Sequence, residues 1–526
     1  MNVSQFFEHW KIAENPFRGE EARHDDVFAR MSAPGDQHPE ATPAPRGVRS
    51  AVAQHSDFEK ILGHLVRPST SIVFGEKGSG KTAIRIQIAD RVERHNARSA
   101  GDKTFIVPYD DLNAELDQLY LRAGEPEDAL KVFRQIRLVD HMDAILARGV
   151  DRLIPALFRE QADSAPADLG PEPHRRAREM SDELKRDLLL LQAVYDPRDR
   201  AGERTARLRR LLRLPPPKDR MLWGGMVAAG WIPAAALWGL LLFLRDEQGQ
   251  PLFTAVLILA SLFTLAYLAV LAKRLAWDAF RFRRLGARLR KQLRFLGRSE
   301  EAYAGALAHL DPPFRNDAHL PINATDEQRY AMLGRLRRVL RHFGHTGVLV
   351  LIDRVDEPTL VNGDADKMQA IVWPMFNNKF LQQESFGIKM LLPIELRHAL
   401  FRESSAFFQE ARLDKQSLVE RLTWSGAMLY DLCDSRLKAC LAPDADEIGL
   451  LDLFAEDVSR QDLVDALDQM HQPRDAFKFL YRCLNEHCSN VTADQNEWRI
   501  PRLVLNNVLR QEADRVQGLY RGIRPA

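Results

Sequence analysis

The chain has 526 residues, which is long enough for two or three domains that each bury a hydrophobic core. A formal net charge of +1 excludes a global electrostatic signal for nucleic acid or for an acidic partner. The cysteine spacings match no zinc module, so we expect buried free thiols in a reducing compartment; the cysteines are Cys433, Cys440, Cys483 and Cys488.

The N-terminal residues are predicted to form a segment and a linker. Residues 1–29 are partly helical in pattern and carry aromatic anchors that we expect to pack on the core of the following domain. They lack the basic start and the apolar stretch of a signal peptide, so nothing indicates export of this part. Residues 31–47 contain four prolines, which is typical of a loop. An amphipathic helix is expected at residues 56–65, with Ser56 or Asp57 as its N-cap.

A nucleotide-binding pattern follows this helix. Residues 71–74 are an apolar, β-branched run that suits a buried strand. A complete Walker A pattern comes directly after it: Gly75, four residues, Gly80, Lys81 and Thr82. We interpret the stretch as a loop that binds the phosphates of ATP, rather than as a glycine-rich turn without a ligand.

Each part of this pattern has a physical reason. Glycine lets the backbone take left-handed angles and turn its N–H groups inward around a phosphate chain. The positive end of the next helix, residues 82–92, would point at the same anion. We expect Lys81 to reach the β- and γ-phosphates, which gives it a catalytic role, and the Thr82 hydroxyl to hold Mg²⁺. The predicted nucleotide-binding residues of the loop are Gly75, Gly78, Ser79, Gly80, Lys81 and Thr82.

Helices dominate the next part of the chain. A short apolar run at residues 104–108 first predicts a second strand of the sheet, and helical patterns then occupy residues 127–158. His141 lies in an apolar stripe there, and we interpret it as a hydrogen-bonded structural residue rather than a ligand. Residues 162–174 are polar and contain several prolines, as in a linker, and residues 175–195 predict a charged amphipathic helix.

Two long stretches without a charge come next, at residues 221–244 and 252–272. As helices they would reach about 36 and 31 Å, against a hydrocarbon core of roughly 30 Å. Buried core helices would not need apolar faces all round, and Pro233 would break most soluble helices. We therefore expect both stretches to span a membrane.

The flanks of these stretches predict their orientation. Only a short turn, residues 245–251, separates the two spans. Residues 201–220 hold seven Lys or Arg, and residues 273–298 hold ten. By the positive-inside rule both flanks are cytoplasmic and the turn is outside, which gives a two-pass hairpin in the inner membrane with cytoplasmic N- and C-terminal parts. The basic flanks either meet anionic headgroups or form a solvated charged face.

An acidic strand completes the predicted nucleotide site. A helix at residues 326–343, with Thr325 as N-cap, precedes the strand at residues 347–358. Between Lys81 and Asp353 lie 271 residues, far more than the dozen or so that a crossover between parallel strands requires. The hairpin and its helical stalks are therefore predicted to be an insertion inside one nucleotide-binding domain.

Acidic residues end this strand and follow it. Asp353 would lie at the carboxyl end of a central parallel strand, where such sheets bind ligands, and is the predicted partner of Mg²⁺ through water. Asp356 or Glu357 could orient the attacking water, and the two alternatives stay open. Arg354 stands where many related ATPases carry the catalytic acid.

The C-terminal part is predicted to alternate between sheet and helix and then to become helical. A helix at residues 364–380 and strands at residues 387–392 and 417–422 are expected. Glu395 and Arg397 would lie where a γ-phosphate sensor sits, or would form an ordinary surface pair. Pro473 and Arg474 begin a later helix, and Arg474 could reach a bound phosphate from a lid or be an exposed arginine.

On these residues the chain resembles bacterial members of the KAP group of P-loop ATPases, within the signal-transduction ATPases that include NACHT domains. The resemblance covers about residues 50–485. It is carried by GEKGSGKT at residues 75–82, by the hairpin inserted before the acidic strand, and by IDRVDE at residues 352–357. The implied domains are an N-terminal segment and linker (1–49), a first half (50–160), a linker and stalk (161–220), a hairpin (221–272), a basic stalk (273–323), a second half (324–430) and a helical lid (431–526).

The resemblance implies an α/β fold with a parallel sheet flanked by helices, interrupted by the hairpin. It also implies a Mg²⁺-dependent ATPase that acts as a membrane-tethered switch, a role that in some relatives serves phage exclusion or the scaffolding of membrane complexes. NACHT-type strands end in an Asp that is followed, after two residues, by Asp-Glu, and this spacing is matched by Asp353, Asp356 and Glu357. KAP proteins more often carry a second aspartate at the position of Arg354. Adenine is expected over guanine on resemblance alone.

Two other functions and one assembly are compatible with the sequence. A nucleotide-gated membrane scaffold with little hydrolysis is the first alternative, and Arg354 favours it. A pore-forming effector is the second, but no charged side chain lies inside either span to line a channel. A homo-oligomer with an arginine finger from a neighbour is also compatible, with Arg397 and Arg402 as candidates.

Overall fold

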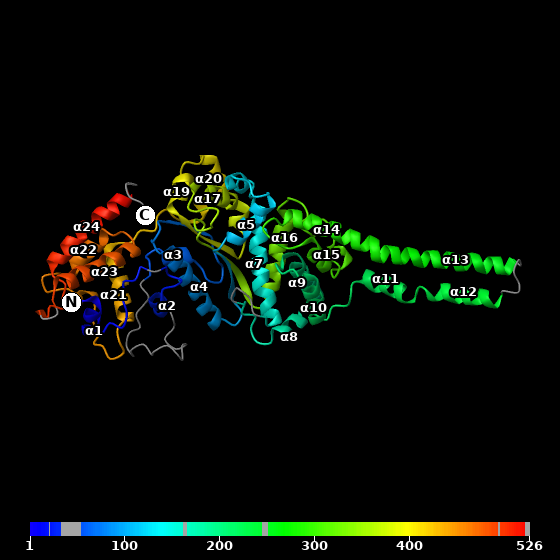
Figure 1. Ribbon diagram of the computed structural model, residues 1–526, viewed down its shortest axis with the longest axis horizontal. Coiled ribbons are helices and arrows are strands. Elements are labelled where there is room, and N and C mark those ends of the chain that lie inside the picture. Colours follow the sequence, from blue (N-terminus) through cyan, green and yellow to red (C-terminus); the bar gives the residue numbers. More distant parts are fainter. Residues whose placement is uncertain (20, 33–53, 161–165, 245–250, 493–494, 521–526) are drawn as a thin grey trace. The chain divides into compact units, whose positions relative to one another are not determined.

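The structure is a computed structural model that describes residues 1–19, 21–32, 54–160, 166–244, 251–492 and 495–520 (Figure 1). It contains two compact units. Unit 1 comprises Met1–Ser99, Leu349–Gln369 and Asn377–Ala526, and unit 2 comprises Ala100–Val348 and Ala370–Phe376. The loop predicted at residues 31–47 lies almost entirely outside the described residues.

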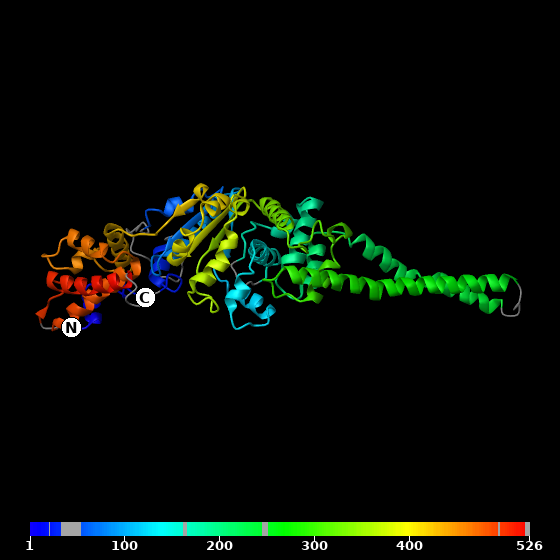
Figure 2. The ribbon, with the colours of Figure 1, turned by 90° about the horizontal axis from the view of Figure 1, so that it is seen from above.

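A five-stranded parallel sheet confirms the predicted α/β class, and its strand order is β2-β3-β4-β1-β5. Figure 2 shows these strands side by side. The central strands are buried along their whole length, as expected for a parallel sheet covered by helices on both faces. The strands are β1 (Ser71–Gly75), β2 (Lys103–Tyr109), β3 (His345–Ile352), β4 (Phe386–Pro393) and β5 (Ser417–Val419).

The strand order places two loops at one edge of the sheet. Strand β1 pairs in parallel with β4, so that Gly75 lies beside Pro393. Strand β3 lies on the other side of β4. Because parallel strands end at the same edge, the loop after β1 and the loop after β3 open on the same side, one strand apart.

The helices that precede and follow the strands of the sheet differ from prediction in detail. The predicted helix at residues 364–380 is broken at Pro374 into α17, a 3-10 turn and α18, because proline cannot continue the hydrogen-bond ladder. The predicted helix at residues 56–65 is only α3, with Asp57 in the N-cap position. The bounds are α3 (Phe58–Leu62), α4 (Lys81–Arg98), α17 (Ala365–Val372), α18 (Asn378–Leu381), α19 (Ile394–Leu400) and α20 (Ser405–Ala411).

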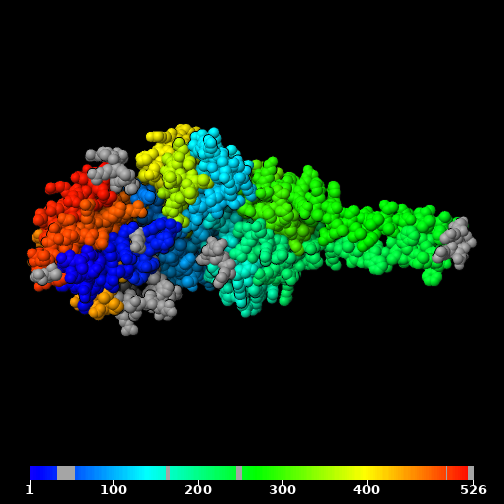
Figure 3. All heavy atoms as spheres, in the orientation of Figure 1, coloured from blue at the N-terminus to red at the C-terminus, as the bar shows by residue number. Residues whose placement is uncertain are grey.

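The N-terminal residues share a hydrophobic core with the C-terminal helices, which corrects the prediction that they pack on the nucleotide-binding core. Figure 3 shows the N-terminal residues, in blue, against the orange and red C-terminal helices. The Trp10 indole donates to the carbonyl of Trp498 at 2.9 Å. The predicted free cysteines lie buried in or beside this core. The helices are α1 (Val3–His9), α2 (Asp26–Ser32), α21 (Gly426–Ala439), α22 (Arg460–Asp468), α23 (Pro473–Asn490) and α24 (Arg502–Tyr520).

Unit 2 is mainly helical, and buried polar groups hold its helices together. The prediction that His141 is structural is confirmed, because its ring bonds the Tyr109 hydroxyl and the Ile371 carbonyl, each at 2.9 Å. The predicted helix at residues 175–195 is two helices, since Ser181 caps a new helix after a break. The bounds are α5 (Asn113–Arg122), α6 (Ala129–Phe133), α7 (Leu138–Phe158), α8 (Pro173–Glu179), α9 (Asp182–Tyr195), α10 (Ala201–Leu211), α15 (Glu300–Leu307) and α16 (Glu327–His342).

One ion pair is fully buried in unit 2. The guanidinium of Arg329 contacts the Asp143 carboxylate at 3.1 Å, and both side chains are 0% exposed. The predicted N-cap of the Arg329 helix was Thr325, but Asp326 occupies that position, because the helix begins at Glu327.

Replacing Arg329 by Met should destabilise unit 2 by about 3–5 kcal/mol, because the Asp143 charge would stay buried without its partner. Arg288→Met is the matched control. Arg288 pairs at 3.2 Å with Asp317, and both side chains are largely exposed, so this change should cost under about 1 kcal/mol. Denaturant unfolding in detergent measures the free energy of unfolding of both variants. Equal losses of stability in the two variants would contradict the prediction.

Two helices of unit 2 are long and apolar enough to cross a membrane, at Lys218–Phe243 and Pro251–Gln292. The first is interrupted at Gly230, just before Pro233, and the second continues through a π turn into the basic stalk. Most of their large apolar side chains are exposed, including Leu262 at 58%. The bounds are α11 (Lys218–Ala229), α12 (Ile232–Phe243), α13 (Pro251–Ala272) and α14 (Asp278–Gln292).

Candidate functional site

The loop after β1 has the backbone geometry of an anion cradle. Gly78 and Gly80 have φ of +97° and +91°, in the left-handed region that favours glycine. A Cβ on Gly78 would lie 2.9 Å from Cβ of Arg474, so the loop also has no room for a side chain there. Gly80 is the N-cap of α4, which turns the first N–H groups of that helix toward the loop.

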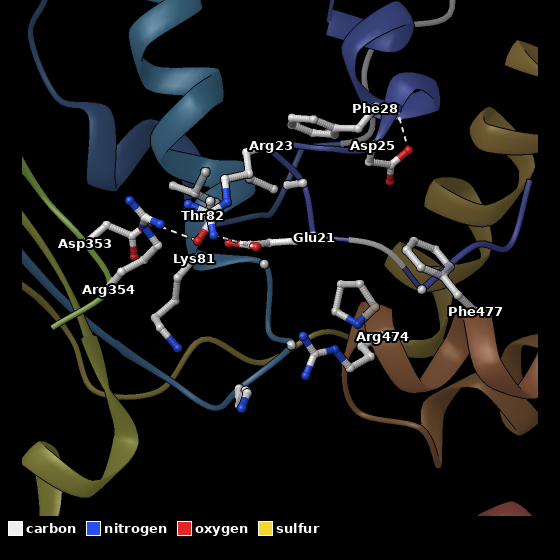
Figure 4. Close-up of a pocket in the computed structure, with 18 of the residues that line it drawn as sticks. Glu21, Arg23, Asp25, Phe28, Lys81, Thr82, Asp353, Arg354, Arg474 and Phe477 are labelled. Atoms are coloured by element: carbon white, nitrogen blue, oxygen red, sulfur yellow. Dashed lines mark hydrogen bonds and ion pairs between the residues drawn. The ribbon is translucent and has the colours of Figure 1, made fainter. Parts of the chain in front are cut away.

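Thr82 and Asp353 meet at this loop although 271 positions separate them. The Thr82 hydroxyl donates to Oδ2 of Asp353 at 2.9 Å (Figure 4). The carboxylate is buried, and among the described residues its other oxygen, Oδ1, has no hydrogen-bond partner. A buried carboxylate oxygen left in this way suits a metal ion or its bound water.

A cation that sequence reasoning missed also contacts this carboxylate. Nε of Arg85, on the second turn of α4, lies 3.4 Å from Oδ2 of Asp353. Burial raises the pKa of the Asp353 carboxyl, and the Arg85 charge and the Thr82 hydrogen bond oppose that rise. No local pattern around Arg85 marks it, because only the folding of β3 against α4 brings the acid to it.

Lys81 lies folded back on the loop. Its ammonium donates to the carbonyls of Gly75 and Glu76 at 2.8 and 2.9 Å. Burial lowers the pKa of this ammonium, and Asp356 provides the largest opposing charge. A phosphate that enters the cradle would compete with two neutral carbonyl oxygens for the lysine, and a charged acceptor makes the stronger hydrogen bond.

The acidic loop after β3 is held in an uncommon conformation. Arg354 has a left-handed φ of +56°, and its guanidinium donates to Oε2 of Glu357 at 3.0 Å. The amide of Gly363 donates to the carbonyl of Asp356 at 2.9 Å, which closes the loop. The pairing of Arg354 with Glu357 was not predicted, since a three-residue spacing in a loop does not fix which side chains meet.

A cavity of about 590 Å³ in unit 1 connects these groups. Residues of the N-terminal segment form part of its wall, so this part of residues 1–29 lies against the loop after β1, in line with the prediction that these residues pack on the following domain. Phe28, Leu432 and Phe477 contribute apolar side chains to its lining, and the buried pair of Asp25 and Arg436 also lines it. Other lining residues include Gly78, Gly80, Lys81, Thr82, Asp353, Asp356, Glu357 and Arg474.

Of the other predicted site residues, some line the cavity and others do not. Arg474 lines the cavity and, as predicted, lies in the first turn of a helix that begins at Pro473. Ser79 is buried, and its carbonyl accepts from the indole of Trp424 at 2.8 Å. Arg397 pairs with Glu420 at 2.9 Å and not with Glu395, so the two sensor candidates do not form one pair with each other.

The described residues contain no group of three or more His, Cys, Asp or Glu side chains placed to hold a metal ion. No protein-family model, curated protein or solved structure matched the chain.

Proposed function

We propose that the protein is a Mg²⁺-dependent ATPase of the P-loop class and of the KAP type, tethered to a membrane by its helical hairpin. The contact between Thr82 and Asp353 carries this proposal. It joins a hydroxyl and a carboxylate from distant parts of the chain directly beside a left-handed glycine loop. P-loop ATPases use the same two groups to hold Mg²⁺.

The residues present fit the parts of such a reaction. The N–H groups of the loop and of the first turn of α4 would bind the phosphates, with Lys81 neutralising charge on them. Thr82 and Asp353 would hold Mg²⁺, which when bound polarises the terminal phosphate. Arg474 would contact the phosphates from α23. The apolar side chains of the cavity lining suit a nucleobase, since bases bind by packing against such side chains.

Asp353→Asn tests the metal role directly. The amide keeps an acceptor for Thr82 but loses the charge that holds Mg²⁺, so turnover should fall by about 10²-fold or more. Affinity for ATP in excess EDTA should not fall, because the variant removes a negative charge beside the polyphosphate. Phosphate release and fluorescent-nucleotide binding measure the two effects. Equal losses of ATP affinity with and without Mg²⁺ would contradict the metal role.

A nucleotide-gated scaffold is the second candidate, and the contact of Arg354 with Glu357 favours it. Burial raises the pKa of the Glu357 carboxyl, and the Arg354 charge opposes that rise, so this contact by itself weakens the acid as a base. In this case the wild-type protein would bind ATP tightly but hydrolyse it no faster than the Asp353→Asn variant. The same two measurements therefore distinguish an enzyme from a scaffold.

A further inference from the structure

We propose that helix α14, where it leaves the hairpin, carries a docking face for the headgroups of anionic phospholipids. The docking face consists of Trp277, Phe280, Arg281 and Arg284. This inference rests on the proposed membrane tether and goes beyond it, because a hairpin alone would accept any lipid. It also decides between the two interpretations of the basic flanks, which were headgroup contact and a solvated charged face.

The four side chains of the docking face lie on one side of the helix. They follow one another at intervals of three and four residues, and such positions are neighbours on the surface of an α-helix. All four residues are exposed, including Trp277 at 61% and Phe280 at 58%. The opposite side of α14 packs on α15 and contains the buried Gly286 and Leu289. The docking face is therefore the side of the helix that unit 2 leaves open.

Exposed aromatic surface continues along the helix beyond the end of the candidate span. α13 ends at Ala272, and a π turn joins it directly to α14, so the two form one long helix (Figure 1). The ammonium of Lys273 lies 3.0 Å from the ring centre of Trp223, which places an aromatic side chain of α11 at the same level. Tryptophan prefers the interface between hydrocarbon and water. A soluble phosphate would use the arginines alone, whereas a lipid surface also uses Trp277 and Phe280.

The arginines of the docking face are not neutralised by the protein. Residues 273–291 contain eight Lys or Arg and a single acid, Asp278. Neither Arg281 nor Arg284 pairs with an acid anywhere in the part of the chain that the structure describes. A guanidinium without a carboxylate partner can donate two hydrogen bonds to one phosphate group. Three other arginines of this stretch do have acidic partners: Arg274 pairs with Asp278 at 3.7 Å, Arg288 with Asp317 at 3.2 Å and Arg290 with Glu300 at 3.2 Å.

Helix geometry brings the charges of the docking face close to the lipid surface. At 1.5 Å per residue, Arg281 and Arg284 lie about 14 and 18 Å along the helix from the end of the span. The headgroup layer accounts for about 5–8 Å of this distance. Helical side chains tilt toward the N-terminus, which is the membrane end of α14, so both guanidinium groups point back toward the headgroups. The remaining gap is comparable with the Debye length of about 8 Å, so anionic headgroups still attract these charges.

Charge-matched variants of the full-length protein in phosphatidylcholine nanodiscs test the docking face. Each disc contains a trace of phosphatidylglycerol or of phosphatidylcholine, labelled on the acyl chain with a fluorophore that accepts energy from tryptophan. The ratio of the two transfer efficiencies measures the preference for the anionic lipid. The wild-type protein should prefer phosphatidylglycerol, and added salt should weaken this preference. Arg281→Gln together with Arg284→Gln should lower the preference by about 5-fold.

The control is Arg288→Gln together with Arg290→Gln, which removes the same number of charges from the same helix. These two arginines are paired with acids, so the preference should change by less than about 2-fold. Equal losses in the two double variants would overturn the proposal, and so would a wild-type protein that enters the disc but does not prefer the anionic probe. A wild-type protein that does not enter the disc would instead overturn the proposed membrane tether.

Discussion

Lys81→Ala should lower ATP turnover by about 10²–10³-fold and also weaken ATP binding. Burial lowers the pKa of the Lys81 ammonium, and the charges of nearby acids oppose that shift. This ammonium donates to two carbonyls of the loop. The variant therefore removes the charge that would meet the phosphates and, in addition, loosens the loop.

Two comparisons separate these effects. Lys81→Met fills much of the same space without a charge, so a loss shared by both variants reports the charge, and an extra loss in Ala reports the loop. Lys415→Ala, an exposed lysine of unit 1, is the control and should leave turnover unchanged. Phosphate release and nucleotide binding are measured for all three. Turnover that survives Lys81→Ala would place the activity in another site or another protein.

Much of the sheet was predictable because its signals are local. The strand before Gly75 and the strand before Asp353 are short apolar runs, and the structure has strands at both. The left-handed angles at Gly78 and Gly80 follow from the type of residue that the loop requires. His141 was also predictable, since a lone histidine in an apolar stripe needs hydrogen-bond partners once it is buried.

The rest of the site depends on contacts between distant segments. Arg85 reaches Asp353 only because β3 ends beside α4, and Arg23 reaches Glu357 only because the N-terminal segment packs on the C-terminal helices. Neither residue lies in a motif. The same reason explains why the aromatic anchors of residues 1–29 were predicted to pack on the wrong core. Their aromatic side chains require a hydrophobic partner, but an apolar face does not specify which core covers it.

Replacing Leu262 and Leu265 together by Arg should abolish stable integration of the hairpin into the membrane. Both leucines are mostly exposed on α13, near the middle of the candidate span. In hydrocarbon each arginine costs about 2.5–3.5 kcal/mol, so the pair offsets much of the favourable insertion of the helix. In water the same change would be tolerated and would improve solubility, because it covers exposed apolar surface with charge.

A hairpin that spans a membrane and a hairpin that lies in water therefore predict opposite results in one assay. Membranes from cells that express each variant are extracted with alkaline carbonate, and the fraction that stays with the lipid is measured. The wild-type chain should stay in the membrane pellet, and the double arginine variant should be released or degraded. Leu503→Arg is the control: it places an arginine at an exposed leucine of α24, outside the hairpin, and should not alter the partition. Wild-type protein in the soluble fraction would contradict the anchor, and the ATP site would then have to be considered without a membrane.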